Sequence, residues 1–139
     1  MKRLLSIALA AILSMAAIAN EAMILPQPAA MKTSDGSYVL KNGCTLVCTG
    51  DMPELAEYTI AMVKERAGIA EVNLQKKGKG NIVLAIDKSV KETEGYTLEA
   101  TSKGVTIKAK TKAGLLFGVQ TLRQLISRTA EVPYVEIKD

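Results

Sequence analysis

The sequence contains no histidine, no tryptophan and a single phenylalanine. Without histidine, this chain alone cannot build a Ser-His-Asp or Cys-His catalytic arrangement, a His-ligated zinc site or an imidazole proton shuttle. Any acid–base chemistry would have to use carboxylate, lysine, tyrosine or cysteine side chains. Aromatic residues make up only 4% of the chain, so it offers few rings on which a bound sugar could stack.

Cysteine is equally scarce, because Cys44 and Cys48 are the only two. Apolar and threonine side chains alternate over residues 44–49, which predicts a β-strand. Four residues of strand separate the two Cα atoms by ~13 Å, whereas a disulfide requires ~4.4–6.8 Å. We therefore predict two buried, small apolar side chains on one face of a strand rather than a disulfide, a redox pair or a metal site.

The N-terminal segment has the pattern of a secretory signal peptide. Two basic residues precede an apolar run over residues 4–18, and small residues follow. The predicted signal peptide is residues 1–19, cleaved after Ala19 or, alternatively, after Ala22. An uncleaved membrane anchor is the other interpretation, but the run is shorter than the ~20 residues of a spanning helix. We expect export to the periplasm or the extracellular space, with no membrane contact after cleavage.

The remaining segment, residues 20–139, is predicted to form one globular domain. The whole chain has 48% hydrophobic and 23% charged residues, a globular composition. It carries 18 Lys and Arg against 14 Asp and Glu, and loss of Lys2 and Arg3 with the signal peptide leaves 16 against 14, a net charge of +2. This small excess gives no reason to expect a nucleic-acid partner.

The hydrophobic periodicity predicts an α+β fold, with a mainly antiparallel sheet and two helices packed on one face. The segments before residue 50 favour a small antiparallel arrangement, and the first helix is expected to begin at Pro53 with Asp51 as its cap. Gly118 within the second helix costs ~1 kcal/mol relative to alanine, so we expect it to permit close contact with the sheet. The expected extended segments are 30–32, 38–40, 44–49, 81–86, 96–100, 105–109 and 133–137, and the expected helices are 53–67 and 112–126.

Two polar segments are candidates for a binding or catalytic site. The Lys/Gly-rich loop at 75–80 lacks the glycine spacing of a phosphate-binding loop, which favours a solvated connection. Glu92 and Glu94 are close in sequence, but they lie in a charged segment where little would raise a carboxyl pKa. The residues themselves therefore predict no catalytic, cofactor-binding or metal-binding residue in this chain.

One stretch near the C-terminus is more specific. Residues 95–98 read Gly-Tyr-Thr-Leu, residues 104–109 read Gly-Val-Thr-Ile-Lys-Ala, and residues 114–125 read Gly-Leu-Leu-Phe-Gly-Val-Gln-Thr-Leu-Arg-Gln-Leu. This pattern resembles the N-terminal accessory domain of family 20 glycoside hydrolases, the β-N-acetylhexosaminidases and chitobiases. The Ile-Leu-Pro-Gln-Pro of residues 24–28 and the last eight residues resemble the beginning and end of that domain. A related domain of family 84 O-GlcNAcase-like enzymes is the less favoured match.

The resemblance implies a role without chemistry of its own. In family 20 this domain precedes a (β/α)₈ barrel, which holds a sugar-gripping arginine and an adjacent Asp-Glu pair, and no cofactor is implied. The sequence ends at Asp139, before any of those positions, so none is carried onto it. The expected partners are a catalytic barrel in cis and, through it, N-acetylhexosamine-containing glycans. The alternative is a stand-alone secreted glycan-binding or assembly domain that uses the helix-free face of its sheet.

Overall fold

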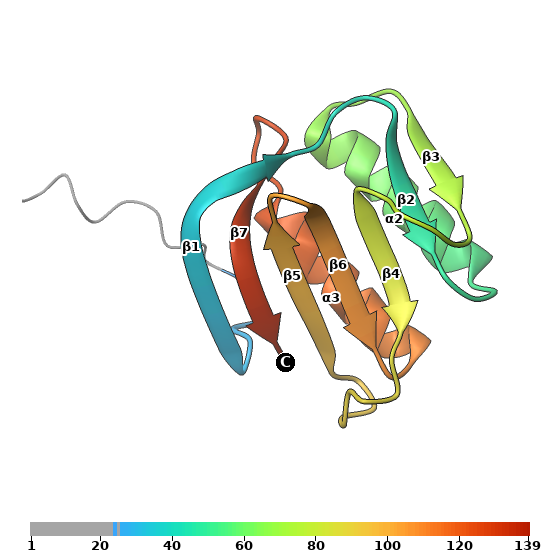
Figure 1. The fold of residues 1–139 in the computed structure, drawn as a ribbon, viewed down its shortest axis with the longest axis vertical. Helices are drawn as coiled ribbons and strands as arrows, with labels where there is room; N and C mark the ends of the chain where they lie inside the picture. The colour runs from blue at the N-terminus through green and yellow to red at the C-terminus, as the bar shows by residue number, and fades with distance from the viewer. Residues whose placement is uncertain (1–23, 25) are drawn as a thin grey trace, which may run out of the picture.

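The computed structural model describes residue 24 and residues 26–139, drawn in colour in Figure 1. The predicted signal peptide and both of its cleavage positions lie outside the described residues. The elements follow in the order β1 (Ala30–Val39), β2 (Cys44–Cys48), α2 (Pro53–Ala67), β3 (Val72–Gln75), β4 (Ile82–Ile86), β5 (Tyr96–Thr101), β6 (Gly104–Ala109), α3 (Lys112–Leu125) and β7 (Glu131–Lys138).

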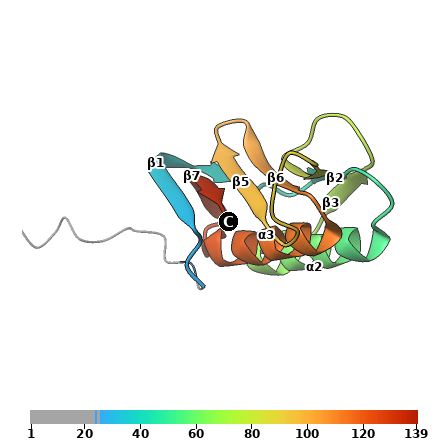
Figure 2. The ribbon, with the colours of Figure 1, turned by 90° about the horizontal axis from the view of Figure 1, so that it is seen from below.

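All seven strands form one sheet in the order β1-β7-β5-β6-β4-β2-β3. Along this order, β1, β7, β5 and β6 are paired antiparallel, while β6, β4, β2 and β3 are paired parallel. Both helices cover the same face of the sheet, and Figure 2 shows the opposite face without a helix. The predicted α+β fold with two helices on one face is confirmed, and the parallel pairs are a feature that the sequence pattern did not reveal.

The β5–β6 hairpin and α3 follow the prediction closely. The register places Leu98 beside Ile107, and both side chains are fully buried beneath α3. The helix begins at the cap Thr111, whose hydroxyl oxygen accepts a hydrogen bond from the Gly114 amide at 3.1 Å. A Cβ atom on Gly118 would lie 2.4 Å from the Cγ2 atom of Ile107. The predicted close contact between this glycine and the sheet is therefore confirmed.

The prediction of a small antiparallel arrangement before residue 50 is wrong. β1 is a single long strand that pairs with β7, and its register shifts between Thr33 and Ser37. The turn-like residues between them are thus accommodated as an irregularity in an edge strand rather than as a reversal of the chain. β2 does not pair with β1, because it lies between β3 and β4 in the parallel half of the sheet.

Two smaller expectations also need correction. The residue that precedes α2 is Met52, which makes no side-chain cap hydrogen bond, and Asp51 does not serve as the cap. The helix begins at Pro53, as predicted, and this residue needs no hydrogen-bond acceptor in the first turn. It ends at Gly68, whose backbone is in the left-handed conformation. The short edge strand β3 was not predicted: its apolar and polar side chains alternate, but the run is only four residues long and leads directly into the Lys/Gly-rich segment.

The core lies between the sheet and the two helices. β4 lies between β6 and β2 with Ile82 and Leu84 fully buried. Its other face is less covered, since Val83 and Ala85 are half-buried. Ile86, at the end of the strand, is 42% exposed. The largest fully buried side chains are Leu46, Ile82, Leu84, Leu98, Ile107, Leu115, Leu122, Ile126 and Ile137.

Within residues 26–139 and at residue 24, the structure contains no helix long and apolar enough to cross a membrane.

Candidate functional site: the outer face of the two helices

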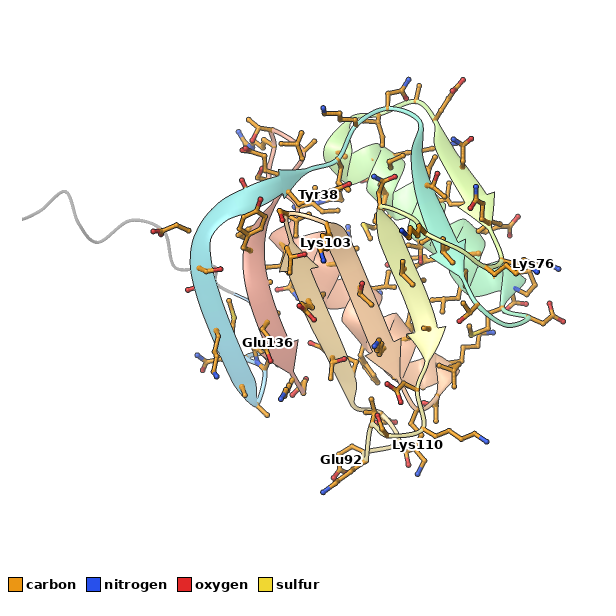
Figure 3. The ribbon with its side chains drawn as sticks, viewed as in Figure 1. Tyr38, Lys76, Glu92, Lys103, Lys110 and Glu136 are labelled. Atoms are coloured by element: carbon orange, nitrogen blue, oxygen red, sulfur yellow. The ribbon has the colours of Figure 1, made fainter. Side chains whose placement is uncertain are left out.

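Of the two glutamates considered from the sequence, Glu92 lines an open hollow of about 430 Å³ together with Asp87 and Asp139, whereas Glu94 is not part of its lining. Glu92 and Glu94 are exposed on the loop between β4 and β5, and Figure 3 shows Glu92 beyond the end of the sheet. On the same loop, hydrogen bonds from Ser89 lower the pKa of the Asp87 carboxyl, which keeps this exposed group ionised. Among the described residues, no three metal-ligating side chains come together.

The two cysteines lie where the alternation placed them. Both are buried on β2, and neither forms a disulfide. Burial raises the pKa of both the Cys44 and Cys48 thiols, so they remain protonated and poorly nucleophilic at neutral pH. The prediction of buried apolar side chains is confirmed.

The largest exposed apolar side chains of the helices gather on the surface that faces away from the sheet. Tyr58 of α2 is 38% exposed, and Leu116 and Phe117 of α3 are 40% and 47% exposed. The opposite side of α3 is fully packed, with Leu115, Val119 and two further leucines in the core. The outer side of α3 thus carries two large exposed apolar side chains, Leu116 and Phe117, among polar residues such as Gln120 and Arg123.

The two helices enclose a shallow hollow on this outer surface. Its volume is about 370 Å³, and Tyr58, Leu116 and Ala113 form part of its lining. Glu54 and Lys112 close one end with an ion pair of 3.6 Å, although both side chains are largely exposed. We use "helix surface" below for this hollow together with the exposed Phe117.

Hydrogen bonds between the helices give the helix surface a fixed shape. The Gln120 amide donates to the Tyr58 hydroxyl at 2.9 Å. At the other end of α2, the Arg66 guanidinium donates to the backbone carbonyls of Arg123 and Ile126 at 3.1 and 3.2 Å. Because these carbonyls end α3, they have no partner within the helix, and the positive charge complements the helix dipole. The arrangement can present a preformed apolar surface to a partner.

A second concave region lies at the other side of the molecule. It has a volume of about 540 Å³ and includes Tyr38 and Tyr134 in its lining. No cluster of aromatic residues was predicted, because 96 positions separate Tyr38 and Tyr134. β1 and β7 bring them together by pairing antiparallel at the edge of the sheet.

The rest of the helix-free face is polar, as predicted. Thr97 and Glu99 of β5 lie beside Lys108 and Thr106 of β6, and all four side chains are half-buried or exposed. Such a pattern of alternating charges and threonines is typical of a solvated sheet face. The apolar surface available for a large partner is thus the helix surface.

The profile described as "Glycosyl hydrolase family 20, domain 2" matches residues 21–139. The chain belongs to this family.

Individual relatives agree with the family match. A beta-hexosaminidase of Porphyromonas gingivalis is 28% identical over 130 residues, which covers 84% of this chain and 17% of that protein. A Streptomyces plicatus beta-hexosaminidase, solved in complex with its product GlcNAc, superposes with a TM-score of 0.76 at 26% identity and covers 84% of this chain and 26% of its own. A β-N-acetylhexosaminidase from Bacteroides fragilis shares the fold, with a TM-score of 0.72 at 22% identity over 86% of this chain and 24% of its own. The chain thus spans about a quarter or less of the length of these relatives.

Proposed function

We propose that this chain is the non-catalytic N-terminal domain of an exported β-N-acetylhexosaminidase, an enzyme that removes terminal N-acetylhexosamine residues from glycans. The observation that carries the proposal is the match of residues 21–139 to domain 2 of glycoside hydrolase family 20, together with relatives of which the matched part covers only 17% and 26%.

In this proposal the helix surface packs against the catalytic barrel. Burial of the exposed apolar side chains of the two helices would favour this packing. The domain would therefore stabilise the barrel through Tyr58, Leu116 and Phe117, while the sheet face stays in contact with solvent.

Export is a further part of the proposal. It is supported by the basic start and the apolar run of residues 4–18. The mature N-terminus is expected to be Asn20, or Met23 if cleavage follows Ala22. Mass spectrometry of the N-terminal peptide from the exported fraction distinguishes these outcomes, and an intact Met1 in the membrane fraction would contradict cleavage.

Two experiments test the enzymatic role. The purified chain is expected to release no chromophore from a chromogenic N-acetylglucosaminide, and activity that co-purifies with the chain would contradict the proposal. The DNA downstream of codon 139 is expected to encode a (β/α)₈ barrel with an arginine near its start and an adjacent Asp-Glu pair. A stop codon with no barrel encoded nearby would argue for a stand-alone role.

The packing surface can be tested on the enzyme that contains this domain. Leu116→Asp with Phe117→Asp should lower the thermal stability of the whole enzyme, because two side chains that the barrel covers would become charged. The matched control is Thr97→Asp with Thr106→Asp on the solvated sheet face, which should leave the melting temperature nearly unchanged. Equal effects of the two pairs would contradict the assignment of the helix surface.

A further inference from the structure

The pocket that contains Tyr38 and Tyr134 lies at one end of the helix-free face. Tyr134 lies on this face, because the strand alternation groups it with Glu136, and Glu136 pairs with Glu99. Tyr38 pairs with the buried Val132 and packs partly against the core, and its hydroxyl contacts the Asn81 side chain in the lining of the pocket. Figure 3 labels Tyr38 and Lys103 near this end of the sheet. The pocket therefore stays open to solvent when a partner covers the helices. It is called the tyrosine pocket below, and its lining is Ser37, Tyr38, Val39, Lys41, Asn42, Gly43, Cys44, Asn81, Ser102 and Tyr134.

Its two rings are held in place by the backbone around them. The Asn81 side-chain amide donates to the Tyr38 hydroxyl at 2.5 Å and accepts from the Thr45 amide at 2.8 Å. A Cβ atom on Gly36 would lie 2.5 Å from the Tyr134 ring, so the glycine backbone packs directly against that ring. Because these contacts fix the tyrosines before any ligand arrives, little conformational entropy would be lost on binding.

The polar groups of the pocket are left available for a ligand. The Tyr38 hydroxyl accepts a hydrogen bond from Asn81 and keeps its own proton free to donate. In the described part of the chain, the Tyr134 and Ser102 hydroxyls and the Lys41 ammonium have no hydrogen-bond or ion-pair partner. Lys41 is the one charged residue among the described lining residues. The pocket thus combines fixed aromatic faces with several hydroxyl and amide groups and little charge.

These properties fit one class of ligand. A sugar ring presents an apolar C–H face that packs on an aromatic ring and a rim of hydroxyls that both donate and accept hydrogen bonds. A volume of about 540 Å³ falls in the range of ~300–1,000 Å³ typical of small-molecule sites. We propose that the tyrosine pocket is a binding site for a short saccharide, with Tyr38 and Tyr134 as the packing surfaces. The choice of N-acetylhexosamine-containing saccharides as its ligands rests on the proposed function.

The test is a titration of the isotopically labelled protein with triacetylchitotriose, a trimer of N-acetylglucosamine, followed by amide chemical shifts. Shifts are expected at the end of β1, at the β5–β6 turn and in β7, with a dissociation constant in the millimolar range or below. Tyr38→Ala is expected to weaken binding at least ~10-fold, which corresponds to 1.4 kcal/mol.

A blocking variant guards against misfolding of Tyr38→Ala. Ser102→Phe adds bulk at an exposed turn that lines the pocket, and it should weaken binding by a similar factor while the remaining spectrum is retained. The matched control is Lys110→Phe, exposed at the opposite end of the sheet (Figure 3), which should bind like the unmodified protein. Absence of shifts in the pocket at ~10 mM saccharide, or unchanged binding by Ser102→Phe, overturns the proposal. Neither result affects the proposed accessory role, which is tested by the downstream sequence and by the helix surface.

Discussion

The contact between Gly118 and the sheet yields a prediction in which two known effects oppose each other. Glycine in the interior of a helix is ~0.8–1.0 kcal/mol less favourable than alanine, so propensity alone predicts that Gly118→Ala stabilises the protein. The added methyl group, however, would lie 2.4 Å from the Cγ2 atom of Ile107 and 3.3 Å from the Tyr96 ring. Ile107 is fully buried, and its Cγ2 is attached directly to the branched Cβ, so it cannot move away alone.

Overpacking of this kind typically costs ~1–3 kcal/mol, and a contact as short as this one belongs near the upper end. We therefore expect Gly118→Ala to lower the free energy of unfolding by about 1–2 kcal/mol, measured by urea denaturation followed by far-UV circular dichroism. Ala61→Gly is the matched control, because it changes the same two residue types at an exposed position in the middle of α2. It should cost ~1 kcal/mol through propensity alone.

A double-mutant cycle locates the cause. Ile107→Leu removes Cγ2, so it should relieve part of the crowding, and the double variant should lose less stability than the sum of the two single variants by at least ~0.5 kcal/mol. Stabilisation by Gly118→Ala, or strict additivity with Ile107→Leu, would refute the claim that this glycine is required by a close approach to the sheet.

Other predictions follow from single interactions. Tyr96→Phe leaves the buried Thr121 hydroxyl without its partner and should cost ~1–2 kcal/mol of unfolding free energy at neutral pH. Because burial raises the pKa of Tyr96 above its usual 10, this contribution is present below pH ~10 and is lost as the pH rises further. The urea curves of the two proteins should therefore converge in alkali, and a constant difference would contradict this. Thr111→Ala removes the cap of α3 and should cost ~1 kcal/mol, whereas Asp51→Ala should be close to neutral, and the reverse order would show that the caps are misassigned. The two cysteines of β2 should react with a thiol reagent far more slowly in the folded protein than in urea, and rapid labelling of the folded protein would contradict their burial.

The accuracy of the sequence-based predictions depended on whether a signal was local. The β5–β6 hairpin and α3 were predicted correctly, because alternation, the turn at Gly104 and the helical period are all contained in residues 96–126. The pairing of β1 with β7 could not be predicted, because it joins segments about 100 positions apart and the Ser-Asp-Gly turn signal suggested a reversal. The prediction of Asp51 as the cap was wrong for a different reason. Pro53, at the first helical position, has no N–H group that needs an acceptor, and Met52 occupies the cap position.

The same distinction explains the candidate sites. The expectation that this chain holds no catalytic residue came from composition and from the resemblance, and it stays a prediction. The tyrosine pocket did not follow, because it depends on the register between two strands from opposite ends of the domain. The helix surface was not predicted. The helical period of residues 112–126 indicated a helix packed on the sheet, but it did not show that Leu116 and Phe117 would remain exposed.

The proposed packing against a barrel depends on Leu116 and Phe117, which are 40% and 47% exposed on α3. The ion pair of Glu54 and Lys112 lies at the same hollow, so the proposed interface would combine apolar side chains with charged ones. Covering half of two large side chains contributes on the order of 1–2 kcal/mol to such an interface, which is enough for their removal to be measured.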